Sequence, residues 1–191
     1  MRKNATAIIL AGGKSSRMGG EDKSLLPVRG IPLIQHIVNQ LNQYFDEIII
    51  GANDTVKYDF LGFRIVPDIE KGKGPLMGIY SCLKSSESEV NFVTGCDIPV
   101  MNIDLILSML KISEGFDIVI PLKSKSEYEP LYAVYRKSVI EKAEHILRNG
   151  GRKIVELLGV SKVKVVELTD TFCYFNINTR DDYNYFINSI S

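Results

Sequence analysis

The 191-residue sequence contains no apolar run approaching the ~20 residues that a membrane-spanning helix needs. It also lacks an excess of charge of either sign, because 23 basic residues balance 23 acidic ones. Without a global positive field, non-specific binding of nucleic acid is not expected, and any anion site must be local. These absences argue against a membrane-spanning protein and against a nucleic-acid partner.

Side chains that bind soft or borderline metals are scarce. The three cysteines, Cys82, Cys96 and Cys173, are odd in number, widely spaced and outside any CxxC pattern, which is typical of reduced thiols in a cytoplasmic protein. The two histidines, His36 and His145, both fall within helical patterns. The sequence therefore offers no ligand set for zinc.

Composition and length are typical of a soluble globular protein. Hydrophobic residues make up 45% of the chain and charged residues 24%. The first residues, 1–6, lead directly into a β-type run without the features of a signal peptide, so export is not expected. We expect a single domain over residues 1–191, located in the cytoplasm.

Short apolar runs alternate with helical patterns along the chain. Such runs suit strands buried on both faces, and their alternation with helices predicts a three-layer α/β/α fold with a mostly parallel central sheet. After residue 121 the pattern becomes mixed, and the polar segment 123–129 is expected to be a surface loop. The expected strands are 5–10, 47–51, 63–66, 90–94, 116–120, 131–135 and 163–168, and the expected helices are 32–44, 75–83, 103–110, 136–147, 153–158 and 181–190.

The most informative segment is LAGGKSSRMGGEDK, residues 10–23, which follows the first expected strand. Its four glycines allow main-chain N–H groups to approach an anion closely, and Arg17 and Lys23 add positive charge. The segment does not fit a Walker A loop, because Ile8 occupies the place of the first glycine. It does not fit the dinucleotide fingerprint either. We interpret it as a triphosphate site of another kind; the alternative is a strand-to-helix turn with solvated charges.

Further polar side chains follow the other expected strands. Ligands of open α/β sheets bind beyond the carboxyl ends of the strands, which is where Asn53, Asp68 and Asp97 fall. Asp97 is the best metal candidate, because Mg²⁺ takes a few carboxylate oxygens together with substrate phosphates and water. The alternatives are a helix cap near Ile103 for Asp97 and a simple turn residue for Asp68.

Two asparagines near the last expected helix form another candidate site. In an extended chain Asn176 and Asn178 point to the same side, while Ile177 points to the core. Amide oxygens coordinate magnesium, and amides hold phosphate oxygens, without adding negative charge. The alternative is that both asparagines only tie the turn before the helix.

Together these motifs resemble the molybdenum cofactor guanylyltransferases along essentially the whole chain. The resemblance implies a Rossmann-like fold of the nucleotide-diphospho-sugar transferase type. It also implies transfer of GMP from GTP to the terminal phosphate of molybdopterin, with Mg²⁺ as cofactor and release of pyrophosphate. The motifs that carry it are LAGG (10–13), RMGG (17–20), DK (22–23), GPLMG (74–78), CDIP (96–99), EPLYA (129–133) and FNINT (175–179).

The resemblance also implies roles for particular residues. Arg17 and Lys23 would neutralise the triphosphate, and Asp97 would hold Mg²⁺. GTP and molybdopterin would be the substrates, and transient contact with molybdopterin-insertion proteins and molybdoenzymes would follow. One departure is Arg180, which stands where the family usually has proline. The implied GTP contacts are Leu10, Ala11, Gly12, Gly13, Lys23, Asn53, Asp68 and Asp97.

Other functions remain open from the sequence. The same chemistry serves a molybdopterin cytidylyltransferase or a sugar-1-phosphate nucleotidyltransferase, although Gly12 favours guanine because the related cytidine enzymes tend to have alanine there. A carrier that binds GTP or the cofactor without catalysis is a further alternative. The presence of both Lys23 and Asp97 argues against such a carrier.

Overall fold

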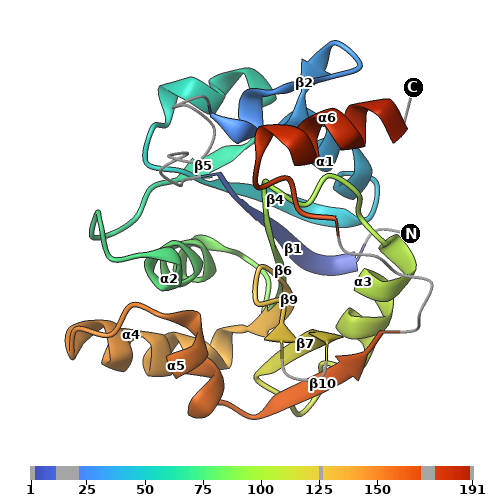
Figure 1. Ribbon diagram of the computed structural model, residues 1–191. Helices are drawn as coiled ribbons and strands as arrows, with labels where there is room; N and C mark the ends of the chain where they lie inside the picture. Colours follow the sequence, from blue (N-terminus) through green and yellow to red (C-terminus); the bar gives the residue numbers. More distant parts are fainter. Residues whose placement is uncertain (1–2, 12–21, 125–126, 169–174, 190–191) are drawn as a thin grey trace.

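A computed structural model describes residues 3–11, 22–124, 127–168 and 175–189 (Figure 1). Its centre is an eight-stranded sheet with the order β10-β7-β9-β6-β1-β4-β5, and β8 pairs with β7 beside this path. The strands are β1 (Lys3–Leu10), β4 (Phe45–Gly51), β5 (Arg64–Val66), β6 (Val90–Gly95), β7 (Ile118–Ser124), β8 (Glu127–Tyr128), β9 (Tyr132–Arg136) and β10 (Val163–Glu167).

The sheet is mixed but mostly parallel, as expected. Strand β1 pairs in parallel with both β4 and β6, β4 with β5, and β7 with β10. Strand β9 runs antiparallel between β6 and β7, and β8 is antiparallel to β7. The parallel strands therefore all end at the same edge of the sheet.

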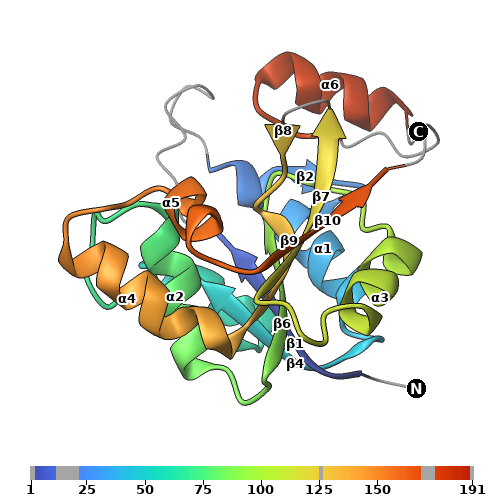
Figure 2. The same ribbon diagram turned by 90° about the horizontal axis from the view of Figure 1, so that it is seen from below.

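Helices cover both faces of the sheet, which confirms the three-layer fold (Figure 2). Along β1, Ala7 and Ile9 point into the core under α1 (Leu33–Leu41) and α3 (Ile103–Lys111), whereas Ile8 points into the opposite core. That second core lies under α2 (Pro75–Ser85), α4 (Ile140–Arg148) and α5 (Ile154–Gly159). Strand side chains alternate between the two faces of the sheet, so one apolar strand contributes side chains to both cores.

Several short elements differ from the sequence expectation. The segment 123–129 is not simply a loop, because β7 extends to Ser124 and pairs with β8. A small hairpin of β2 (Pro27–Val28) and β3 (Ile31–Pro32) precedes α1 and turns through Arg29 and Gly30, both at positive φ. The described residues also include the 3₁₀ helices η2 (Lys23–Leu25), η3 (Val56–Leu61) and η4 (Lys137–Val139).

The last described helix, α6 (Arg180–Ser189), packs on the hairpin and the start of α1 rather than on the main sheet (Figure 1). A third apolar cluster holds it there. Ile177, just before the helix, is fully buried in this cluster, as expected. The buried members are Leu26, Val28, Leu33, Ile177, Tyr183 and Phe186.

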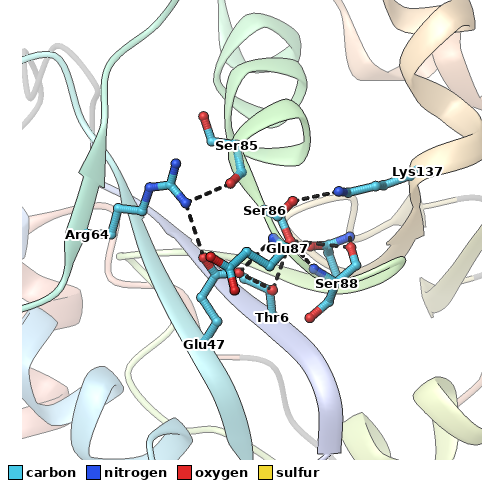
Figure 3. A network of polar contacts seen from close by, with 9 residues as sticks. Thr6, Glu47, Arg64, Ser85, Ser86, Glu87, Ser88 and Lys137 are labelled. Carbon is cyan, nitrogen blue, oxygen red and sulfur yellow. Dashed lines mark hydrogen bonds and ion pairs between the residues drawn. The ribbon is translucent and has the colours of Figure 1, made fainter.

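A polar network fastens the carboxyl end of α2 to the sheet (Figure 3). The Ser86 hydroxyl lies 2.8 Å from Thr6 Oγ1, and Thr6 donates a 2.6 Å hydrogen bond to Glu47. Glu47 also accepts the Glu87 N–H, and Lys137 donates to the Ser86 carbonyl at 2.6 Å. This network fixes the carboxyl end of α2. The first turn of the helix lies at the opposite edge of the sheet.

Among the described residues, none of the helices combines the length and the apolar character that a bilayer crossing requires.

Candidate functional site

Four parallel strands end in one row at the edge of the sheet. Leu10 of β1 is level with Gly51 of β4 and Gly95 of β6, and Gly51 is level with Val66 of β5. Backbone hydrogen bonds continue just past the strands: Ala11 N–H donates to the Gly51 carbonyl at 2.9 Å. The expected nucleotide contacts Leu10, Ala11, Asn53, Asp68 and Asp97 follow these strand ends.

Asn53 and Asp68 are joined by two hydrogen bonds. Asn53 Nδ2 donates to Asp68 Oδ2 at 2.8 Å, and the Asp68 N–H donates to Asn53 Oδ1 at 3.0 Å. These bonds connect the ends of β4 and β5, so Asp68 does more than cap its own turn. Asn53 is exposed and Asp68 half-buried, which leaves both accessible to a ligand in a fixed orientation.

Asp97 follows β6 and folds back over the end of that strand. A Cβ added at Gly95 would lie only 2.5 Å from Asp97 Oδ1, so glycine at position 95 gives this carboxylate its space. The alternative role as a helix cap is wrong, because Asn102 caps α3 by accepting the Leu105 N–H at 3.0 Å. Asp97 is half-buried, and its carboxylate does not serve the helix.

The segment before α6 meets this edge of the sheet. The Ile177 N–H donates to the Asp97 carbonyl oxygen at 2.8 Å. Asn178 Oδ1 accepts a 3.3 Å hydrogen bond from Lys23 Nζ, 155 positions away in sequence. The structure therefore brings together Lys23, Asp97, Asn176 and Asn178, four residues singled out in the sequence.

Asn176 has an acceptor without a partner. Its Nδ2 donates a long hydrogen bond of 3.4 Å to Glu129 Oε2, while its Oδ1 is buried and, among the described residues, accepts no hydrogen bond. Unpaired buried acceptors are uncommon because they lose hydration without compensation. An unmatched amide oxygen near Asp97 is a ready ligand for a cation or for the donor group of a substrate.

Helix α6 begins normally despite Arg180. The Thr179 hydroxyl accepts the Asp182 N–H at 3.1 Å, and Asp182 Oδ2 accepts the N–H groups of Asn178 and Thr179 at 2.9 and 2.8 Å. Hydrogen bonds from the Asn178 N–H and from Thr179 lower the pKa of Asp182. This reciprocal cap ties the turn, so the side chain of Asn178 is left for Lys23.

A buried phenol lies beside the glycine-rich segment. The Tyr58 hydroxyl is within hydrogen-bond distance of the Ala11 carbonyl, of Asp22 and of Ser24. Lys57 forms an ion pair with Asp22. Burial raises the pKa of Asp22, but hydrogen bonds from Lys57 and Ser24 outweigh it, and the net shift is downward. Asp22 is therefore an ionised carboxylate.

Two residues of this edge were not singled out individually in the sequence. Glu129 belongs to the EPLYA motif, and its carboxylate accepts a hydrogen bond from Asn176, whereas Tyr58 belongs to no motif. The signal for Glu129 was its place in the EPLYA motif. For Tyr58 the sequence carries no signal, because its partners are far away along the chain.

Cys96 is not a nucleophile in this arrangement. Burial, followed by the neighbouring Asp97 and Asp22 carboxylates, raises the pKa of the Cys96 thiol to about 12. The thiol stays protonated and weakly reactive at neutral pH. Cys96 packs against the apolar core beneath α1, so we interpret it as a packing residue.

Three expected site residues, Gly12, Gly13 and Arg17, lie outside the described residues. Within the described part of the chain, no group of three or more histidine, cysteine, aspartate or glutamate side chains is placed to hold a metal ion. Asp97 and the amide oxygen of Asn176 are oxygen donors of the kind that Mg²⁺ accepts beside water and phosphate.

A mixed α/β sheet covered on both faces, with polar side chains gathered beyond the ends of its parallel strands, is typical of α/β proteins that bind nucleotides. The fold is similar to that of the crystal structure of molybdopterin-guanine dinucleotide biosynthesis protein A from Archaeoglobus fulgidus, with a TM-score of 0.82 at 24% identity over 97% of each chain. Residues 7–164 match the MobA-like NTP transferase domain, and the chain belongs to this family of nucleotidyltransferases.

Curated relatives extend over nearly the full length. The chain is 36% identical to the probable molybdenum cofactor guanylyltransferase of Natranaerobius thermophilus, covering 95% of this chain and 94% of that one. It is 34% identical to the molybdenum cofactor guanylyltransferase of Vibrio parahaemolyticus, covering 92% and 91%. The family resemblance seen in the sequence motifs is thereby confirmed.

Proposed function

We propose that this protein transfers GMP from GTP to molybdopterin, which forms the guanine dinucleotide cofactor and releases pyrophosphate. The names of the relatives support this reaction, since they match at 34–36% identity over nearly the whole chain. The structural observation that best supports this reaction is the hydrogen bond between Lys23 and Asn178 beside Asp97. This places a cation, an amide and a carboxylate at one edge of the sheet.

In the proposed reaction a phosphate oxygen of the pterin attacks the α-phosphorus of GTP. A new P–O bond forms as the bond between the α-phosphorus and the bridging oxygen breaks, and the electron pair leaves with pyrophosphate. The attacking oxygen is already anionic, so no general base is required. Catalysis then consists of positioning and charge neutralisation, which suits the few ionisable groups of this site.

Individual residues take separate parts in this proposal. Lys23 binds the triphosphate, and Asn178 orients the Lys23 side chain. Leu10 and Ala11 with the Asn53–Asp68 pair form the wall against which the nucleoside lies. Gly12, Gly13 and Arg17 would complete the triphosphate contacts.

Mg²⁺ is the cofactor that we propose for the site. Asp97 would hold it, and the unpaired Oδ1 of Asn176 is a suitable second oxygen. Bound there, Mg²⁺ would supply neutralisation of phosphate charge. Transient contact with molybdopterin-insertion proteins and molybdoenzymes, and a cytoplasmic location, stay predictions.

The decisive experiment measures product and pyrophosphate from molybdopterin with GTP, CTP, UTP or ATP in the presence of Mg²⁺. We expect transfer with GTP, and GTP to bind at least roughly tenfold more tightly than CTP, because a base edge with the wrong hydrogen-bond pattern leaves site groups unpaired. Thermal shifts with the same nucleotides give an independent measure, since selective binding stabilises by mass action.

The other outcomes of this experiment identify the alternatives. Equal affinity for GTP and CTP by calorimetry, or preferential transfer of CMP, would replace the proposal by a cytidylyltransferase. Nucleotide binding without any pyrophosphate release would indicate a non-catalytic carrier.

A further inference from the structure

Tyr58 lies on the short helix η3 and is 1% exposed. Its hydroxyl oxygen lies 2.8 Å from the Ala11 carbonyl oxygen, 3.1 Å from Asp22 Oδ2 and 2.9 Å from Ser24 Oγ. A buried phenol hydroxyl needs a hydrogen-bond partner, and which groups it joins shows what the residue can hold in place.

The partners of Tyr58 belong to the two flanks of the glycine-rich segment. Ala11 precedes that segment and Asp22 follows it. One hydroxyl group thus joins the end of β1 to the residue immediately before Lys23, although Tyr58 is 47 positions from Ala11 and 36 from Asp22. Among the described residues, no other side chain forms hydrogen bonds to both Ala11 and Asp22.

The protons available in this cluster can be counted. The Ala11 carbonyl and the ionised Asp22 only accept, and Lys57 and the Ser24 N–H already donate to Asp22. The Ser24 hydroxyl donates to Asp22 Oδ1 at 2.7 Å, so the single Tyr58 proton is shared between the Ala11 carbonyl and Asp22 Oδ2. Burial raises the pKa of Tyr58, so the phenol keeps this proton.

Lys57 strengthens the same arrangement from the adjacent position. Its ammonium group pairs with Asp22 and lies 5.9 Å from the centre of the Tyr58 ring. Helix η3 thus supplies a hydrogen bond and a counter-charge to one carboxylate. Because Lys23 directly follows Asp22, an anchored Asp22 fixes the backbone from which Lys23 reaches Asn178.

We propose that Tyr58 is a positioning residue for nucleotide transfer, whose hydroxyl holds Ala11 and Asp22 together and thereby orients Lys23 toward the substrate. This role rests on the proposed function. It assigns to the segment between β4 and β5 a part in the reaction, with GTP as the ligand whose binding and turnover depend on it.

The test compares Tyr58→Phe with Tyr80→Phe. Tyr80 is a matched control, because it is 5% exposed and its hydroxyl accepts a hydrogen bond from Lys84 away from the glycine-rich segment. We expect Tyr58→Phe to lower kcat/KM for GTP by about 10- to 100-fold, the scale of losing a hydrogen bond to a charged group. The KM for molybdopterin and the activity of Tyr80→Phe should stay near wild type. An unchanged kcat/KM for GTP in folded Tyr58→Phe would overturn the proposal.

A double-mutant cycle separates positioning from a general loss of stability. If Tyr58 acts through Lys23, Tyr58→Phe should have little further effect on kcat/KM in the Lys23→Ala background. Full additivity of the two losses would contradict the proposed route.

If Tyr58→Phe does not fold, a second variant, Lys57→Gln, tests the same proposal. Lys57 has a side chain that is 33% exposed, so Lys57→Gln should fold and should lower the same kcat/KM in the same direction by a smaller factor. An unchanged value there would also count against the proposal. If the wild-type protein transfers no GMP, the proposed function fails, and GTP affinity by calorimetry still decides the role of Tyr58: equal affinity in wild type and variant overturns it.

Discussion

At the scale of single residues, Asp97 has the clearest claim to chemistry. Its carboxylate is half-buried at the end of β6, the backbone of Gly95 leaves space for it, and Asn102 rather than Asp97 caps α3. A residue of this kind contributes to turnover through its charge rather than through packing. Replacing Asp97 with asparagine, its neutral isostere, therefore isolates the contribution of the carboxylate charge to turnover.

We expect Asp97→Asn to keep its melting temperature and to lose transfer by on the order of 10²-fold or more, the usual scale for removing one preorganised charge contact. Steady-state rates at limiting Mg²⁺ measure this. Asp104→Asn is the control, because Asp104 is exposed in the first turn of α3. Activity of Asp97→Asn within about twofold of wild type would remove Asp97 from the site.

At the scale of secondary-structure elements, the start of α6 decides where Asn178 points. The reciprocal bonds between Thr179 and Asp182 also hold the Asn178 N–H. A helix on the hairpin therefore controls a side chain at the strand ends. Stability and substrate binding should respond together when this cap is weakened.

Thr179→Ala removes the hydroxyl of the cap. We expect a loss of about 1 kcal/mol, which corresponds to a fall of roughly 2–4 °C in melting temperature for a chain of this size. The KM for the substrates should rise, because Asn178 is held less firmly. Thr179→Ser keeps the hydroxyl and should behave like wild type. A destabilised Thr179→Ala with unchanged KM would show that the cap supports only the helix.

A second element-level feature joins β7, α4 and the chain before β10. Asp117 accepts hydrogen bonds from Lys142 at 2.5 Å, Ser138 at 2.6 Å and the Lys162 N–H at 2.7 Å. Burial alone would raise its pKa, but these bonds, led by that from Lys142, lower it to about 2. Three elements therefore depend on one ionised carboxylate.

This pKa gives a prediction for acid unfolding. A carboxyl whose pKa is depressed in the folded state stabilises the fold fully above its unfolded pKa, near 4, and loses that contribution as the pH falls toward about 2. Asp117→Asn should destabilise the protein at neutral pH by on the order of 1 kcal/mol, allowing for solvent screening, and should flatten the loss of stability between these pH values. Denaturant titrations at several pH values measure it. Equal slopes in wild type and variant would contradict this.

At the scale of the whole molecule, the sequence predicts the main architecture because the buried strands leave strong patterns. Runs such as 5–10 and 90–94 are apolar and β-branched, and the structure places β1 and β6 there. The hairpin β2–β3 is not predicted, because Pro27 and Pro32 stand in its two short strands. The β7–β8 pairing is not predicted, because the segment 123–129 that includes β8 is mostly polar.

In the candidate site too, some residues could be predicted from the sequence and others could not. The strand-end residues could be predicted, because parallel strands of one sheet end at a common edge whatever the helices do. The contact of Lys23 with Asn178 could not be derived from spacing, since it depends on how α6 packs on the hairpin. Tyr58 could not be predicted either, because a short 3₁₀ helix carries no periodic pattern that marks an inward hydroxyl.

The sequence distance between Lys23 and Asn178 has a consequence for biosynthesis. Asn178 leaves the ribosome 155 residues after Lys23, which at about 5–20 residues per second is roughly 8–31 s later. Strands β1, β4, β5 and β6 all precede it, so the nascent chain can bury most of its sheet during this interval. A partly synthesised chain thus has a nucleotide edge without its amide partner, and the complete site appears only once the segment before α6 has arrived.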